Sequence, residues 1–203
     1  MTKLDLKKEF REFYNPSSKK CAIVDVPEMQ FLMVDGSGDP NTSVAYSQAL
    51  EALYGMSYTL KFFSKLTLGI DYVVMALEGL WWTEDMADFS EDDKDAWDWT
   101  AMIMQPDHLT ADHAETARDE LRSKKNPPAL DKLRFERFHE GLSVQIMHLG
   151  PYADEAPTIR GLHAFATEQG YRLRGKHHEI YLSDPRRTAP ERLRTVIRQP
   201  VSE

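Results

Sequence analysis

The chain has 203 residues, of which 41% are hydrophobic and 29% are charged, as in a folded soluble protein. Its formal net charge of −8 disfavours a nucleic-acid-binding surface, which needs a basic footprint. The single cysteine, Cys21, excludes an intrachain disulfide. The sequence contains no run of about 18 apolar residues, so it predicts no membrane span. We therefore expect a cytoplasmic protein whose partners include no nucleic acid and no membrane.

The first half of the sequence predicts a strand, a helix and two further strands. An apolar run ends at Gly36, Gly38 and Pro40, which is typical of a strand followed by a turn. Asn41 or Thr42 is expected to cap the helix, whose apolar residues recur at spacings of three, four and seven. The expected elements are a strand over residues 28–40, a helix to about residue 64, and strands over 71–82 and 97–106.

The second half predicts the same order of elements. Pro157 suits the first turn of a helix, and Gly170 suits its C-terminal end. The expected elements are a strand over residues 142–152, a helix over 156–170, and strands over 176–185 and 192–201. Between the two halves, Thr110 is expected to cap a peripheral helix over residues 112–125, which Pro127 and Pro128 close.

The order strand–helix–strand–strand thus occurs twice, which predicts an α+β fold. One such unit cannot cover both faces of its sheet, so we expect two units to pack together with pseudo-two-fold symmetry. A ligand groove is expected between the two repeats. We predict one domain over residues 1–203, with a first repeat over about 22–107, a connecting helix over about 110–128 and a second repeat over about 134–203.

The strand at 71–82 is expected to form one wall of that groove. Its side chains alternate between two faces, and we expect Trp81 on the helix-packed face. Glu78 and Trp82 share the other face, where a carboxylate among apolar residues suits a pocket wall. If the repeats superpose, Glu78 corresponds to Glu179. A glutamate in such a pattern is most often solvent-facing, and a slip of one residue would exchange the faces, so these alternatives stay open.

No metal site and no cofactor are expected. His177 and His178 are adjacent on a predicted strand and therefore point to opposite faces, so they cannot bind one metal ion together. Neither histidine, nor His148, has a spacing that marks a haem ligand. The sequence also lacks a Gly-x-Ser-x-Gly nucleophile motif and a complete phosphate-binding glycine loop.

The segments "ALEGLWW" and "HHEIYLSDPRRTAPERLRTVIRQPV", with the repeated order of elements, resemble the GyrI-like small-molecule-binding family. This family is related to the effector-binding domains of multidrug-responsive regulators and to SOUL haem-binding proteins. The resemblance covers the chain from about residue 20 to its end. It implies a cleft lined by aromatic side chains, with a central glutamate that Glu179 matches, followed by Tyr181. Planar aromatic or cationic small molecules are the implied partners.

Within that family the chain resembles the cyclopropanoid cyclopropyl hydrolases, which use water to open the strained cyclopropane of DNA-alkylating natural products. The resemblance implies catalytic roles for Glu179, which would orient or deprotonate the water, and for Tyr181, which with His177 could stabilise the oxyanion. A non-catalytic drug-binding or effector-sensing module is the alternative, because many relatives only bind. The ligand-binding candidates are Trp82, Glu78, Tyr54, Trp99, Tyr152 and His177. The sequence predicts no oligomeric state.

Overall fold

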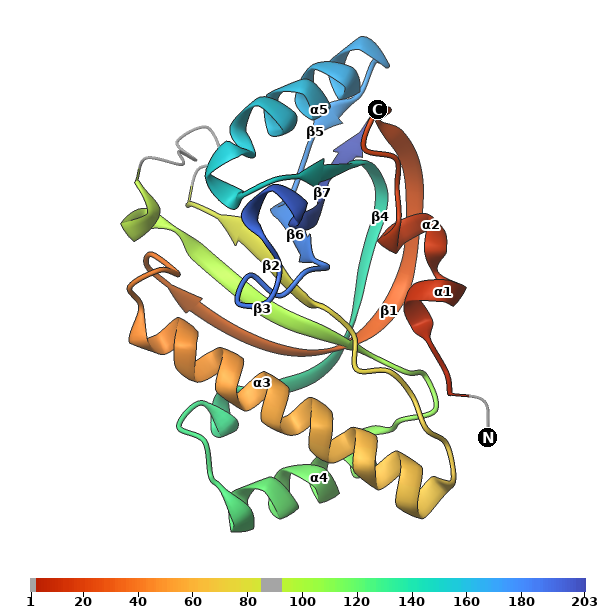
Figure 1. Cartoon of the computed structure of the whole chain (residues 1–203), viewed down its shortest axis with the longest axis vertical. Helices are drawn as coiled ribbons and strands as arrows, with labels where there is room; N and C mark the ends of the chain where they lie inside the picture. Colours follow the sequence, from red (N-terminus) through yellow and green to blue (C-terminus); the bar gives the residue numbers. More distant parts are fainter. Residues whose placement is uncertain (1–2, 85–92) are drawn as a thin grey trace.

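The protein is described by a computed structural model that covers residues 3–84 and 93–203 (Figure 1). In this part of the chain, six antiparallel strands close into a barrel in the order β4-β1-β3-β2-β6-β7, and β7 pairs back with β4. A short strand, β5, extends the sheet beyond β7. The strands are β1 (Ala22–Ser37), β2 (Leu77–Trp82), β3 (Asp98–Gln105), β4 (Arg134–Leu149), β5 (Arg172–Leu173), β6 (His177–Tyr181) and β7 (Arg194–Ser202).

Helices cover the outside of the barrel. The long helix α3 packs against β1 and β3, and α5 packs against β4 and β7. Helix α4 packs on α3, on the side away from the barrel (Figure 1). The helices are α1 (Leu6–Glu9), α2 (Arg11–Tyr14), α3 (Val44–Phe63), α4 (Ala111–Lys124) and α5 (Ala156–Glu168). None of the helices in the described ranges combines the length and apolar character that crossing a membrane requires.

The helix ends follow local side-chain chemistry. The Ser43 hydroxyl caps α3 by accepting the backbone N–H of Tyr46 at 3.2 Å. The predicted cap at Asn41 or Thr42 is therefore wrong, because the Asn41 side chain donates to Asp39 at 2.7 Å instead. Thr110 caps α4 as predicted.

In the first half the predicted order of a strand, a helix and two strands is confirmed, whereas in the second half the short strand β5, which was not predicted, lies between α5 and the expected strands β6 and β7. Strands β1 and β4 are longer than expected, with 16 residues each. Each curves around the barrel. The added part of β4, residues 134–141, is mostly polar, and in β1 Pro27 separates the short apolar segment 22–26 from the main apolar run. In the first half β1, β3 and β2 are neighbours, and in the second half β4, β7 and β6 are neighbours. The two sets meet where β1 pairs with β4 and where β2 pairs with β6.

Candidate functional site

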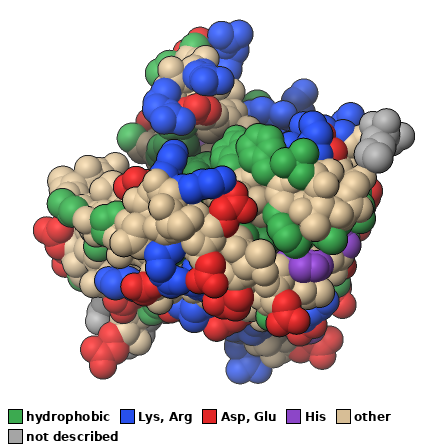
Figure 2. Space-filling model, turned by 90° about the horizontal axis from the view of Figure 1, so that it is seen from below, with side chains coloured by type: hydrophobic (Ala, Val, Ile, Leu, Met, Phe, Trp, Pro, Cys, Tyr) green, Lys and Arg blue, Asp and Glu red, His purple; other side chains and the backbone are tan. Residues whose placement is uncertain are grey.

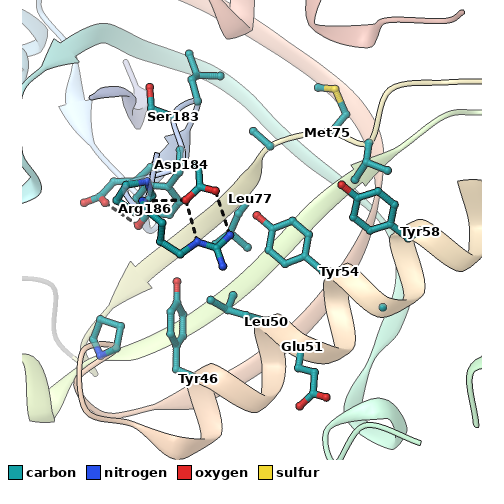
Figure 3. A pocket seen from close by; sticks show the side chains of 18 of the residues that line it. Tyr46, Leu50, Glu51, Tyr54, Tyr58, Met75, Leu77, Ser183, Asp184 and Arg186 are labelled. Atoms are coloured by element: carbon teal, nitrogen blue, oxygen red, sulfur yellow. Dashed lines mark hydrogen bonds and ion pairs between the residues drawn. The ribbon is translucent and has the colours of Figure 1, made fainter. Parts of the chain in front are cut away.

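A groove of about 1640 Å³ lies on the outer side of the barrel, over the β2–β6 pair (Figure 3). Helix α3 forms one wall, and the loop after β6 with the start of α5 forms the other. On that loop, Arg186 Nε and Nη2 donate to Asp184 at 3.0 and 3.1 Å. Typical ligand pockets measure about 300–1,000 Å³, so the groove has room for a drug-sized molecule.

Glu179 lies at the inner end of the groove with a side chain that is 13% exposed. Its Oε2 accepts a hydrogen bond from the Tyr181 hydroxyl at 2.7 Å, and its Oε1 lies 3.1 Å from His177 Nε2. The Tyr181 oxygen in turn accepts the Trp81 indole N–H at 3.1 Å. Burial raises the pKa of Glu179, but the hydrogen bond and charge of His177 outweigh burial and hold that pKa below its usual value. The site thus contains a buried, ionised carboxylate.

Aromatic rings surround this carboxylate. The Trp81 ring centroid lies 5.8 Å from Tyr46 and 5.5 Å from Trp97, and Tyr152 lies 5.5 Å from Tyr181 in an edge-on arrangement. Burial raises the pKa of Tyr152 to about 12 and that of Tyr181 well above its usual value, so both phenols are neutral near pH 7. Such rings can stack on a planar ligand.

Gly79 gives the Trp81 indole its position. A Cβ atom on Gly79 would lie 2.7 Å from Trp81 Nε1, so a larger residue would push the indole away from Tyr181. Strand β2 pairs with β3 residue by residue from Leu77 to Trp82, without an extra residue at Gly79. The groove therefore depends on a glycine in an otherwise regular strand.

The structure brings some of the predicted site residues together and separates others. Glu179, Tyr181, His177, Tyr54 and Tyr152 line the groove. Glu78, Trp82 and Trp99 lie away from its lining: Trp99 is buried beneath Tyr46, with ring centroids 5.0 Å apart. The roles of all eight residues stay predictions. Tyr46, Trp97 and Glu155 line the inner end and were missed, because only the alternation of strands and the resemblance guided the choice.

Trp81 lies on the helix-facing side of β2, as predicted, but the groove lies on this same side instead of on the opposite one. Trp81 pairs with His177 and lies on the groove face, where the prediction had Trp82. Glu78 and Trp82 lie on the opposite face, which the barrel encloses, and Lys176 Nζ is 3.2 Å above the Trp82 ring centroid. Glu78 faces the barrel interior and Glu179 faces the groove, so the two carboxylates that were expected to correspond do not meet in one groove. The alternation was correct, but closure of the sheet makes the helix-facing side the groove wall.

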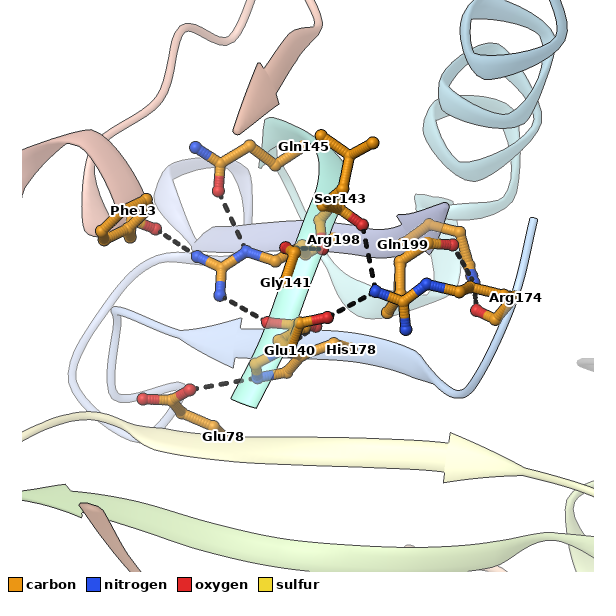
Figure 4. Close-up of polar contacts among 12 residues, drawn as sticks. Phe13, Glu78, Glu140, Gly141, Ser143, Gln145, Arg174, His178, Arg198 and Gln199 are labelled. Carbon is orange, nitrogen blue, oxygen red and sulfur yellow. Dashed lines mark hydrogen bonds and ion pairs between the residues drawn. The ribbon is translucent and has the colours of Figure 1, made fainter. Parts of the chain in front are cut away.

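Inside the barrel, Glu78 belongs to a second polar cluster, which we call the interior cluster: Tyr14, Glu78, Glu140, His178 and Arg198. Figure 4 shows the last four of these residues. His178 Nδ1 lies 2.9 Å from Glu140, and its Nε2 lies 3.0 Å from Glu78. Arg198 donates to Glu140 at 2.9 Å, and the Tyr14 hydroxyl donates to Glu78 at 2.7 Å. Both nitrogens of His178 face carboxylates, so the ring is an imidazolium and the cluster is electrically neutral.

The charges in this cluster shift each other's protonation. Burial lowers the pKa of His178, but the negative charge of Glu140 outweighs burial and raises that pKa from 6.5 to about 9. Burial raises the pKa of Glu140, but the charges of His178 and Arg198 lower it from 4.5 to about 2. No local sequence pattern marks this cluster, because its members come from segments far apart in the chain.

The interior cluster predicts a pH dependence of stability. The contribution of His178 is complete below pH 6.5 and is lost as the pH rises towards about 9, whereas that of Glu140 is complete above pH 4.5 and is lost as the pH falls towards about 2. We expect the free energy of unfolding to fall by roughly 2 kcal/mol between pH 6 and pH 8. Urea unfolding at several pH values across this range measures this decrease. If the free energy of unfolding of His178→Gln fell just as steeply with pH as that of the wild type, the assignment to His178 would be wrong.

A serine and a histidine also meet outside the groove. Ser64 Oγ lies 2.8 Å from His108 Nε2, but the Ser64 hydroxyl donates to the Ile70 carbonyl at 2.7 Å. No carboxylate among the described residues hydrogen-bonds His108, so this pair lacks the third member of a catalytic triad. Within residues 3–84 and 93–203, no group of three or more histidine, cysteine or acidic side chains could hold a metal ion.

Known proteins share this fold and much of this sequence. The GyrI-like small molecule binding domain matches residues 19–202. A conserved protein from Listeria innocua is 43% identical, with a TM-score of 0.92 over 98% of this chain and 100% of that protein. Two Listeria innocua structures described as hydrolases are 42% and 41% identical, with TM-scores of 0.89 and 0.86; they cover 99% and 98% of this chain and 100% of their own chains. No curated protein matches the chain.

Proposed function

Because the chain belongs to the GyrI-like small-molecule-binding family, we propose that its groove binds planar aromatic xenobiotics and hydrolyses cyclopropanoid DNA-alkylating compounds. The observation that carries this proposal is the buried, ionised Glu179 among aromatic rings at the inner end of a drug-sized groove. The two similar Listeria innocua proteins described as hydrolases add support for a hydrolytic activity.

Opening of the strained cyclopropane requires the protein mainly to place a water molecule beside the reacting carbon. The oxygen of a water molecule forms a bond to the cyclopropane methylene, and the strained carbon–carbon bond breaks. Its electron pair passes into the ring, where the dienone carbonyl becomes a phenolate. A base removes one proton from the attacking water. Glu179 is ionised and suits this role, which is worth about 10²- to 10⁴-fold in rate. Stacking on the surrounding rings adds about 0.5–1.5 kcal/mol for each contact.

The geometry favours a positioning role for Tyr181. Its single hydroxyl proton points to Glu179, and its oxygen already accepts the Trp81 N–H. Donation to a ligand oxyanion would require Tyr181 to give up its hydrogen bond to Glu179. In this proposal, Tyr181 and His177 therefore hold the carboxylate in place from two sides.

The duplicated repeat belongs to the same proposal. Exchanging the halves converts the order β1-β3-β2 into β4-β7-β6, and it leaves the β1–β4 and β2–β6 pairings unchanged. The groove lies over β2–β6, one of these two junctions. This pairing scheme supports a ligand groove on a pseudo-two-fold axis.

Replacing Glu179 with glutamine tests the hydrolytic activity. The purified protein is incubated with a spirocyclopropyl-dienone alkylator, and the water-addition product is followed by mass spectrometry. We expect Glu179→Gln to lose at least about 100-fold in kcat, because the amide cannot accept the proton. Glu51→Gln, which changes another groove-lining carboxylate on α3, is the matched control and should keep the activity. If the protein bound the alkylator saturably but formed product no faster than buffer alone, it would be a non-catalytic drug-binding module and not a hydrolase.

A further inference from the structure

Tyr46 stands in the first turn of α3, with its ring fixed against the inner end of the groove. Ser43 caps this turn through the Tyr46 backbone N–H, at 3.2 Å. The Tyr46 ring meets Trp99 edge-on, with centroids 5.0 Å apart and an interplanar angle of 85°. Trp81 packs at 5.8 Å on another side. The two tryptophans and the helix cap therefore hold the phenol in one orientation.

The hydroxyl group of Tyr46 points into the groove, away from α3 and towards the side of Asp184 and Arg186 (Figure 3). No described residue hydrogen-bonds this hydroxyl. Two other tyrosines differ from Tyr46 in this respect, because the Tyr181 hydroxyl donates to Glu179 and the Tyr14 hydroxyl donates to Glu78. Tyr46 thus combines a fixed ring with a hydroxyl proton that no described residue accepts.

The electrostatic surroundings keep this proton on the oxygen. Burial raises the pKa of Tyr46 well above its usual value, and the negative charge of Glu179 raises it further. Tyr46 is therefore a neutral hydrogen-bond donor over the whole physiological range. A partly buried donor without a protein acceptor favours a ligand that brings one, because an apolar ligand would leave the donor unsatisfied.

We infer that the Tyr46 hydroxyl binds an oxygen acceptor on the ligand, so that the groove prefers planar aromatic ketones and phenolates to hydrocarbons of the same shape. This inference rests on the proposed function and adds a specificity-determining residue to it. A spirocyclopropyl dienone carries its strained carbon and its carbonyl oxygen at opposite ends of one ring. Two different groups must therefore contact these ends, and both Glu179 on β6 and Tyr46 on α3 line the groove.

The test compares two probes of equal shape, 9-fluorenone and fluorene, by equilibrium dialysis. We expect the wild-type protein to bind the ketone about tenfold more tightly than the hydrocarbon. Tyr46→Phe removes only the oxygen atom, so it should abolish this preference while leaving the Kd for fluorene unchanged. Tyr58→Phe is the matched control, because Tyr58 lies on the same helix, is 50% exposed and is not one of the ligand-binding candidates. It should keep the preference for the ketone.

The outcomes separate this inference from the function on which it rests. Binding of both probes with no preference in the wild type, or equal losses for both probes in Tyr46→Phe, would overturn the role of Tyr46 and leave the groove as a ligand site. Failure of the wild type to bind either probe would overturn the proposed binding function and this inference with it. Fluorene affinity also reports whether the groove is intact in Tyr46→Phe, because that probe needs no hydrogen bond.

Discussion

Replacing Glu140 with leucine is expected to lower the free energy of unfolding by about 3–5 kcal/mol, the usual cost of removing one partner from a buried ion pair. Glu140 is 3% exposed, and its two oxygens accept from His178 and Arg198 at 2.9 Å each. Without this carboxylate, one guanidinium and one imidazolium remain inside the barrel against Glu78 alone. Arg198 also donates to the Phe13 carbonyl at 2.8 Å, so we expect the docking of α2 to weaken too.

Urea unfolding of Glu140→Leu and Glu136→Leu provides the comparison. Glu136 lies on the same strand, but its side chain is 49% exposed and its ion pair with Arg134 is accessible to water. Exposed pairs are typically worth about 0–1 kcal/mol, so Glu136→Leu should change stability little. A loss below about 1 kcal/mol in Glu140→Leu would mean that the interior cluster contributes no more than a surface pair.

The order of the elements was predictable because local signals mark each of them. The turn after β1, the proline in the first turn of α5 and the glycine after that helix are all local features. The strand expected over residues 71–82 is the exception, because only Leu77–Trp82 is a strand. The exact starts of β1 and β4 were not predictable, since long-range pairing between the two strands carries β1 through Pro27 and β4 through the mostly polar residues 134–141.

The assignment of faces failed for a different physical reason. Alternation along β2 shows which side chains share a face, but the choice between the faces depends on where the sheet closes. Glu78 was expected in the groove because a carboxylate among apolar residues suits a pocket wall. The barrel instead encloses Glu78 with His178, a residue 100 positions away, and the pair is 3.0 Å apart. No local pattern encodes that contact.

Tyr46 shows a related limit. Its spacing along α3 fits a helix face directed at the barrel, and two tryptophans indeed pack against its ring. The same side chain is both a packing residue and a groove residue, because only its hydroxyl end reaches the groove. Periodicity describes the face on which a ring lies, but it does not describe where a cavity opens along that face.

Replacing Trp81 with alanine is the second change with a large expected effect, a loss of about 3–5 kcal/mol in the free energy of unfolding. Trp81 is 3% exposed and packs against Tyr46 and Trp97. Its indole N–H is also the donor that orients the Tyr181 hydroxyl towards Glu179. The variant should therefore lose ligand affinity as well as stability, which titration with 9-fluorenone measures under conditions where the variant remains folded.

Two further variants separate the contributions of the Trp81 ring and its N–H group. Trp81→Phe keeps an aromatic ring but cannot donate to Tyr181, so we expect a smaller loss of stability than in Trp81→Ala, with a Tyr181 hydroxyl that is held less firmly towards Glu179. Trp82→Ala is the comparison, since Trp82 lies on the opposite face, is only partly buried against the core and also contacts Lys176, so its loss of stability should be smaller than that of Trp81→Ala. A larger loss of stability in Trp82→Ala than in Trp81→Ala would contradict the pairing of Trp81 with His177, and the groove wall would then have to lie on the face that carries Glu78.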